Sequence, residues 1–216
     1  MAQIFHRAAN PLSKASIFGG LFIVAALVYV FDLLYTGPYV NEESVIREQP
    51  VPFSHKHHAK ELGIDCRYCH TSAESSSFAG IPSVKTCMSC HSQIWNKSPM
   101  LEPIREAYRT GEPIRWVRVN GLPDYVYFDH SIHVAKGVGC TTCHGPMGDM
   151  PLSWRQASLQ MKWCLECHRK PEDFVRPRQD VFNISWRRPS DQKAQGQKLV
   201  QEYHIKKLTD CYTCHR

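Results

Sequence analysis

The sequence contains no cysteine outside a single five-residue pattern, C-x-x-C-H. Its 10 cysteines fill five copies of this pattern, so none is left for a structural disulfide or a free reactive thiol. The chain also lacks a coherent basic face: its 26 lysines and arginines are dispersed, with one local cluster at 169–188, and the formal net charge is only +6. We therefore expect no nucleic-acid partner.

The five copies, called the first to fifth motif in chain order, have the spacing that covalent haem attachment requires. Two thiols one helical turn apart bond the two vinyl groups of haem, and the adjacent imidazole becomes the proximal ligand of the iron. A zinc ribbon, a thioredoxin-like pair or a disulfide needs the cysteines but not the histidine. The sequence predicts five c-type haems, attached by Cys66 and Cys69, Cys87 and Cys90, Cys140 and Cys143, Cys164 and Cys167, and Cys211 and Cys214, with proximal ligands His70, His91, His144, His168 and His215.

Residues are too scarce to build an ordinary hydrophobic core around each motif. The segment 41–216 supplies about 35 residues for each of the five haems. Prolines, glycines and short polar stretches favour loops and short helices over extended sheet. We expect a mostly irregular fold with short α-helices wrapped around the haems, one N-terminal transmembrane helix and a small β-hairpin, and no folding without haem.

The N-terminal region contains no charge from Ala15 to Phe31. With its continuation to residue 36, this stretch is long enough to cross a hydrocarbon core of about 30 Å. A cleaved signal peptide is the competing interpretation, but no A-x-A cleavage pattern follows. Because Arg7 and Lys14 precede the span, the positive-inside rule predicts a single-pass anchor in a bacterial inner membrane, with the haem-binding part on the periplasmic side.

Histidines outside the motifs indicate how the second axial position of each iron is filled. Two clusters repeat as F-x-H-x-x-H, and positions i and i+3 share one face of a helical turn. One further histidine precedes the fifth motif. The predicted distal ligands are His55, His58, His130, His133 and His204. Met150, in the loop that also contains Met147, is the alternative ligand for the fifth haem, because thioether ligation occurs in c-type cytochromes.

The repeated clusters also predict an internal duplication. We expect a cytoplasmic N-terminus at 1–14, an anchor at 15–36, a tether at 37–52, a first dihaem repeat at 53–91, a connector at 92–127, a second dihaem repeat at 128–168, a connector and helix at 169–202, and a fifth-haem half-unit at 203–216.

Local patterns predict a few regular elements outside the motifs. A helix is expected from Pro99 to Thr110, ended by Gly111. The residues 116–119 and 125–128 are expected to pair as a hairpin. A second helix is expected within 190–207, with Leu199, Tyr203 and His204 on the face that meets the fifth haem.

Three stretches resemble a known family: GIPSVKTCMSCHSQIW, YFDHSIHVAKGVGCTTCHG and MKWCLECHRKPEDFVRPR are similar to the pentahaem cytochrome c subunit of bacterial alternative complex III, a quinol:electron-acceptor oxidoreductase. The resemblance covers nearly the whole chain. It implies a relay subunit that does not catalyse a reaction alone. The implied partners are membrane-embedded quinol-oxidising subunits, an iron-sulfur subunit and a soluble or tethered periplasmic carrier. Some relatives extend beyond the last motif, so we expect the docking role of such an extension to be absent here.

The two repeats also resemble small class III multihaem cytochromes c. In that family the first histidine of F-x-H-x-x-H ligates the haem of the next motif and the second ligates a later one. The resemblance implies the first role for His55 and His130 and the second for His58 and His133.

Two other functions stay open at this point. A singly anchored quinol dehydrogenase would oxidise quinol directly at a haem near the membrane. A multihaem reductase of nitrite or a similar oxyanion would need one axial position open to substrate, and five distal ligands for five irons argue against it.

Overall fold

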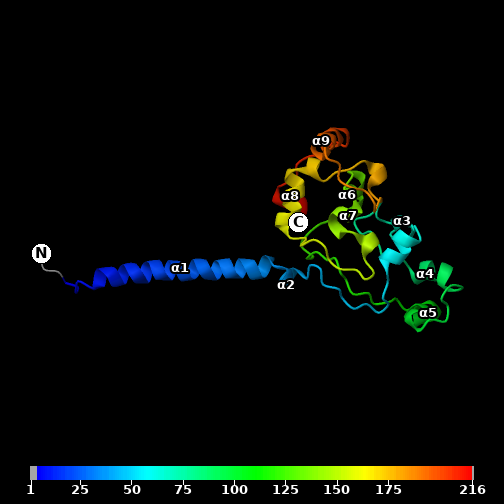
Figure 1. The fold of residues 1–216 in the computed structure, drawn as a ribbon, viewed down its shortest axis with the longest axis horizontal. Coiled ribbons are helices and arrows are strands. Elements are labelled where there is room, and N and C mark those ends of the chain that lie inside the picture. Colours follow the sequence, from blue (N-terminus) through cyan, green and yellow to red (C-terminus); the bar gives the residue numbers. More distant parts are fainter. Residues whose placement is uncertain (1–3, 216) are drawn as a thin grey trace. The chain divides into compact units, whose positions relative to one another are not determined.

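The computed structural model describes residues 4–215, so the ends of the expected segments 1–14 and 203–216 lie outside the described residues. The chain divides into two compact units, an N-terminal unit at 1–43 and a C-terminal unit at 44–216 (Figure 1). The helical elements are α1 (Ala9–Thr36), α2 (Pro38–Asn41), the π-helix η1 (Lys56–Glu61), α3 (Cys66–Cys69), α4 (Val84–His91), η2 (Pro99–Leu101), α5 (Glu102–Thr110), α6 (His130–Ala135), α7 (Cys140–His144), η3 (Met147–Asp149), α8 (Met161–Arg169), η4 (Pro171–Asp173), η5 (Arg178–Asp180), α9 (Gln192–Glu202) and α10 (Cys211–Cys214).

The N-terminal unit is dominated by α1, which contains the predicted anchor 15–36 and begins earlier, at Ala9. None of its residues is buried, and its most apolar window has a mean hydropathy of 2.4. The helix is therefore long and apolar enough to cross a membrane, as an anchor or as a signal segment. The tether expected at 37–52 is not extended throughout, because it includes α2.

The C-terminal unit has short helices joined by long irregular segments (Figure 1). Its one cluster of buried apolar residues is small: Val51, Leu101 and Ile104, with α4 and Trp116 packed against it. Part of this cluster is Cys87 and Met88 of the second motif, and the expectation that bound haem forms much of the interior stays a prediction.

The helix predicted at 99–110 is confirmed as η2 followed by α5. Gly111 ends it in the left-handed region, at φ 81°, where glycine carries no steric penalty. Ile104 and Ala107 are buried on the inner face.

The predicted hairpin is wrong: residues 4–215 form no strand, only two isolated antiparallel bridges. The two segments expected to pair with each other, 116–119 and 125–128, each form hydrogen bonds with another part of the chain instead. The side-chain amide of Gln49 donates to Val117 O at 2.9 Å and accepts from Val117 N at 3.0 Å, as a neighbouring strand would. Tyr127 N donates to Cys214 O at 2.8 Å.

The helix predicted within 190–207 is shorter than expected, because α9 ends at Glu202. Tyr203 follows in a turn and is buried, accepting at its carbonyl oxygen from Lys136 Nζ at 2.6 Å. His204 then adopts a left-handed φ of 51° and is exposed. The expected common face of Leu199, Tyr203 and His204 therefore does not form.

The close packing of α9 on η4 depends on Gly196. A Cβ atom there would lie 1.9 Å from Glu172 O, a backbone atom that cannot move aside alone. Substitution Gly196→Ala should lower the stability of the haem-loaded protein by about 1–3 kcal/mol through overpacking, measured as a lower midpoint of thermal unfolding. The control is Lys198→Ala on the exposed side of α9, for which we expect no comparable loss. Equal midpoints for the two variants would refute this account of the packing.

Candidate haem attachment sites

Four histidine pairs bring the ring of a motif histidine close to the ring of a histidine from an F-x-H-x-x-H cluster. The ring centroids are 6.5 Å apart for His55 and His70, 6.2 Å for His58 and His91, 6.3 Å for His130 and His144, and 6.2 Å for His133 and His168. Metal–histidine nitrogen bonds are about 2.0–2.1 Å long, and a ring centroid lies roughly 1.2 Å beyond its nitrogen, so two imidazoles on opposite sides of one metal ion have centroids about 6.4–6.6 Å apart. The four pairs come within about 0.2 Å of the spacing expected for two axial ligands of one iron.

Hydrogen bonds at the opposite ring nitrogen orient most of these imidazoles. A carbonyl oxygen can only accept, so a nearby Nδ1 carries the proton and leaves Nε2 free for metal, as is usual for ligating histidines. The Nδ1 atoms with carbonyl partners are those of His58 (Ser54 O, 2.8 Å), His70 (Gly80 O, 2.7 Å), His91 (Ile94 O, 3.1 Å), His130 (Ser77 O, 2.8 Å), His133 (Asp129 O, 2.6 Å), His168 (Leu208 O, 2.9 Å) and His215 (Tyr125 O, 3.2 Å).

The innermost imidazoles are held in the neutral form that binds metal. Burial, followed by the neighbouring imidazoles of His70, His58 and His144, lowers the pKa of His55 to about 4. Burial also lowers the pKa of His144 to about 4, with smaller effects from His130 and His70. A neutral ring offers its lone pair to iron, whereas a protonated ring does not.

A phenylalanine fixes the two histidines of each cluster. Phe53 meets His55 edge-on at 4.9 Å and stacks on His58 at 4.4 Å. Phe128 makes the same contacts in the second repeat, at 4.7 Å with His130 and 4.5 Å with His133. The two repeats thus reproduce one ring arrangement, although the first uses the π-helix η1 and the second the α-helix α6.

His57 does not belong to this arrangement, as its position between the paired histidines indicates. Its Nδ1 lies 2.9 Å from Glu61 Oε2 on the exposed side of η1. It therefore serves as an internal comparison for the neighbouring His58.

Every motif lies on a short helix, so its two thiols emerge from one turn. The carboxylate of Asp65 accepts from Arg67 N at 2.8 Å at the start of α3, and Asp210 accepts from Thr213 N at 3.1 Å at the start of α10. The ten cysteines form no disulfide with one another, and burial is the main cause that raises the pKa of the Cys140 thiol to about 11 and of the Cys143 thiol to about 12. Residues 4–215 contain no group of three or more His, Cys, Asp or Glu side chains that would hold a metal ion directly, so a zinc ribbon finds no support.

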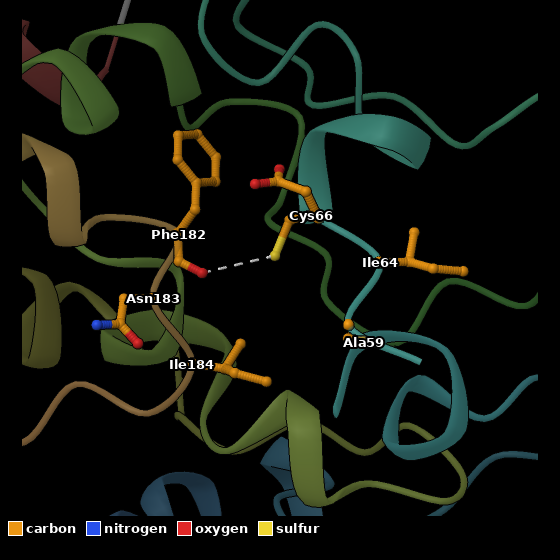
Figure 2. Close-up of a pocket in the computed structure, with 8 residues that line it drawn as sticks. Ala59, Ile64, Cys66, Phe182, Asn183 and Ile184 are labelled. Carbon is orange, nitrogen blue, oxygen red and sulfur yellow. Dashed lines mark hydrogen bonds between the residues drawn. The ribbon is translucent and has the colours of Figure 1, made fainter. Parts of the chain in front are cut away.

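A pocket of roughly 200 Å³ borders the first motif (Figure 2). It is lined on one side by Ile64 and Cys66 and on the other by Phe182 and Ile184. The Cys66 Sγ atom faces Phe182 O at 4.0 Å. The pocket is smaller than the usual 300–1,000 Å³ of a ligand site, and its wall includes the predicted attachment thiol of Cys66.

The fifth motif lacks a histidine pair in the described residues. The ring of Tyr125 lies 5.8 Å from that of His215, on the side of the bonded Nδ1. No ring contact joins His204 to His215 within 4–215, and the role of His204 as distal ligand stays a prediction. Met150 is fully buried, and its carbonyl oxygen accepts from Lys56 N at 3.0 Å, which favours packing against the first repeat.

Arg176 is a candidate functional residue that the sequence interpretation missed. Its side chain is 2% exposed, and Nη2 donates to the hydroxyls of Thr141 at 2.9 Å and Thr142 at 3.1 Å, inside the third motif. Its Nε is buried without a hydrogen-bond partner, and the guanidinium forms no ion pair with any described residue. A buried, incompletely paired cation is costly unless an anion completes its environment, and haem carries two carboxylates. The only sequence signal was a basic segment interpreted as a connector.

Comparisons with known proteins support the haem interpretation of both halves of the chain. Residues 126–216 match the family described as cytochrome c7 and related cytochrome c, and residues 36–110 match the class III cytochrome c family. Each match covers less than half of the chain, yet together they include every C-x-x-C-H motif. These matches confirm covalently bound haem of the c type.

A curated relative shares part of the chain. The multiheme cytochrome c subunit of menaquinone reductase from Nitratidesulfovibrio vulgaris is 37% identical over 99 residues, which are 45% of this chain and 46% of the relative. The similarity thus spans about half the length of that protein. The comparisons thus show similarity to multihaem cytochromes c, including the class III family, and they do not single out alternative complex III.

The ring planes predict two classes of low-spin iron. The pairs with His70 and His144 are nearly parallel, at 7° and 8°, whereas the pairs with His91 and His168 are crossed, at 64° and 62°. Because the relative orientation of axial imidazoles sets the splitting of the iron d orbitals, electron paramagnetic resonance of the ferric protein should show two irons of each class. The substitution His58→Ala should remove one crossed-ring signal. The matched control His57→Ala should leave the spectrum unchanged, and loss of a signal in His57→Ala instead would contradict the ligand set.

The charge of Arg176 should raise the reduction potential of the haem on the third motif. A nearby cation disfavours the additional positive charge of the ferric form, so Arg176→Gln should lower the midpoint potential of one haem, by an amount on the order of 1 kcal/mol. Spectroelectrochemical titration measures this shift. The control is Arg178→Gln, because the Arg178 side chain is exposed and lies over Tyr203 at 4.1 Å. Unchanged potentials in both variants would contradict the role of Arg176.

Proposed function

We propose that this chain is a membrane-anchored pentahaem cytochrome c that relays electrons between a quinone-reactive membrane complex and a carrier on the outer side of a bacterial inner membrane. The observation that carries this proposal is the set of four histidine pairs at 6.2–6.5 Å. When bound, each haem supplies an iron that cycles between ferric and ferrous states by one electron. Two protein ligands on an iron leave no position for a substrate, which favours transfer over catalysis.

The protein contributes rigid ligand positions to this transfer. Carbonyl oxygens bond Nδ1 of most of the paired rings, and Phe53 and Phe128 contact the two histidines of each cluster. The ligand geometry therefore needs little rearrangement when an electron arrives or leaves. For the fifth haem we propose His215 and His204 as ligands, supported by the position of His204 seven residues before Cys211, as His133 stands before Cys140.

Helix α1 supports a membrane location for the chain. Its length and apolar surface suit a single span, and Arg7 and Lys14 before its apolar part favour a cytoplasmic N-terminus. The haem-binding unit then lies on the outer side, where c-type cytochromes are assembled. The partners we propose are membrane-embedded quinol-oxidising subunits, an iron-sulfur subunit and a soluble or tethered carrier, on the resemblance to alternative complex III.

The direction of electron flow has two candidates. The resemblance to alternative complex III favours flow from quinol to the carrier. The name of the relative, a menaquinone reductase subunit, favours flow into the quinone pool. Both candidates use the same closed axial coordination.

A test with the full-length chain in detergent separates a relay from an enzyme. Cyanide binds a ferric iron with an open axial position, so the relay should show no change in its Soret absorption or its low-spin resonances when cyanide is added. A change affecting one haem would favour the oxyanion reductase. The isolated chain should also fail to oxidise a soluble quinol analogue that the intact membrane complex turns over, and oxidation by the chain alone would favour the singly anchored quinol dehydrogenase.

A further inference from the structure

We infer that the five attachment motifs are arranged in space in the order second, first, third, fourth, fifth, so that the second and fifth motifs form the two ends of the array. This order differs from the order in the sequence, because the first two motifs are reversed. It concerns the arrangement of the chain's own residues and does not rest on the proposed direction or partners of the relay.

The second and first motifs are neighbours. The distal histidines of both come from one turn, and Phe53 contacts both rings. The variable residues of the motifs also meet, since Tyr68 and Ser89 join their hydroxyls at 3.0 Å. Within the described residues, no hydrogen bond or ring contact joins the second motif to the third, fourth or fifth.

The first and third motifs meet across the two repeats. The ring of His55, partner of the first motif, has its Nδ1 3.0 Å from Ser153 Oγ, in the segment after the third motif. Reciprocally, the ring of His130, partner of the third motif, has its Nδ1 2.8 Å from Ser77 O, in the segment after the first motif. Each repeat thus supports the distal ligand of the other.

One segment of the chain, at residues 181–182, contacts both the first and the third motif. Cys140 N donates to Val181 O at 3.2 Å, and Cys66 Sγ approaches the next carbonyl oxygen, that of Phe182, at 4.0 Å. Lys60 also forms an ion pair with Asp149, which connects η1 to η3. The two repeats therefore meet through the first and third motifs. The second and fourth motifs lie on either side of this contact.

The third and fourth motifs repeat the contact of the first pair, because Phe128 contacts both distal rings of the second repeat. Cys143 and Cys167 are close enough to affect each other electrostatically.

The fourth and fifth motifs are also neighbours. His168 Nδ1 lies 2.9 Å from Leu208 O, just before the fifth motif. Figure 1 agrees within the C-terminal unit, where α4, α3, α7 and α8 succeed one another from right to left across the view.

The exposure of the cysteine thiols independently distinguishes the two end motifs of the array from the other three. Cys90 of the second motif and Cys211 of the fifth are exposed, while the other eight cysteines are partly covered. In a relay, partners that deliver and accept electrons would reach the haems of the second and fifth motifs.

The arrangement is tested by the electrostatic couplings between haems in the full-length protein. Nuclear magnetic resonance of the haem methyl groups through the stages of oxidation measures how reduction of one haem lowers the affinity of each other haem for an electron. A linear order predicts four strong couplings, with two haems that have a single strong coupling each. A branched or closed pattern in the wild type would overturn the inference without any variant.

Two distal substitutions identify the haems in this pattern. His58→Met should shift the resonances and raise the potential of the second-motif haem, which we expect to have one strong coupling. His130→Met should do the same for the third-motif haem, with two strong couplings. Arg176→Gln provides a further assignment of the third-motif haem if a methionine variant does not retain five haems. A second-motif haem with two strong couplings, or coupled to the fourth-motif haem, would refute the order, whereas the outcome of the cyanide test leaves it unaffected.

Discussion

The separation between paired imidazole rings is the constraint on which the rest of the C-terminal unit depends. Four pairs keep their ring centroids 6.2–6.5 Å apart, close to the separation expected for two imidazoles that bind one iron from opposite sides. Each pair joins residues from different elements, so the positions of the helices follow from the pairs. Backbone carbonyls that bond Nδ1 convert short, irregular segments into rigid supports.

Because the unit has little apolar core, much of the remaining chain positions the histidine pairs through hydrogen bonds and local packing. The one buried cluster lies around Val51 and Ile104, beside α5. The segment 171–184, in contrast, buries Val175 and Val181 and presents consecutive carbonyl oxygens to the first and third motifs. Arg176 in the same segment brings a buried charge against the third motif. The segment 171–184, interpreted from the sequence as a connector, thus holds the first and third motifs in place.

The internal duplication underlies the spatial order inferred for the five attachment motifs. Two repeats with the same ring geometry meet through their first motifs, and each uses a serine from the other to bond a distal histidine. Such an exchange fixes the distance between the two inner sites without a large interface. The second and fifth motifs remain at the outside, where Cys90 and Cys211 are exposed.

The sequence by itself predicted the attachment residues and the proximal histidines and contained the F-x-H-x-x-H clusters, because haem attachment and axial ligation are local patterns of fixed spacing. Helices such as α5 were also predictable, since proline and glycine mark their ends. Only the tertiary structure decided which rings face each other, the burial of Arg176, the end of α9 before His204 and the absence of the hairpin. Those features depend on contacts between distant segments, such as Gln49 with Val117 and Tyr127 with Cys214, which no local periodicity encodes.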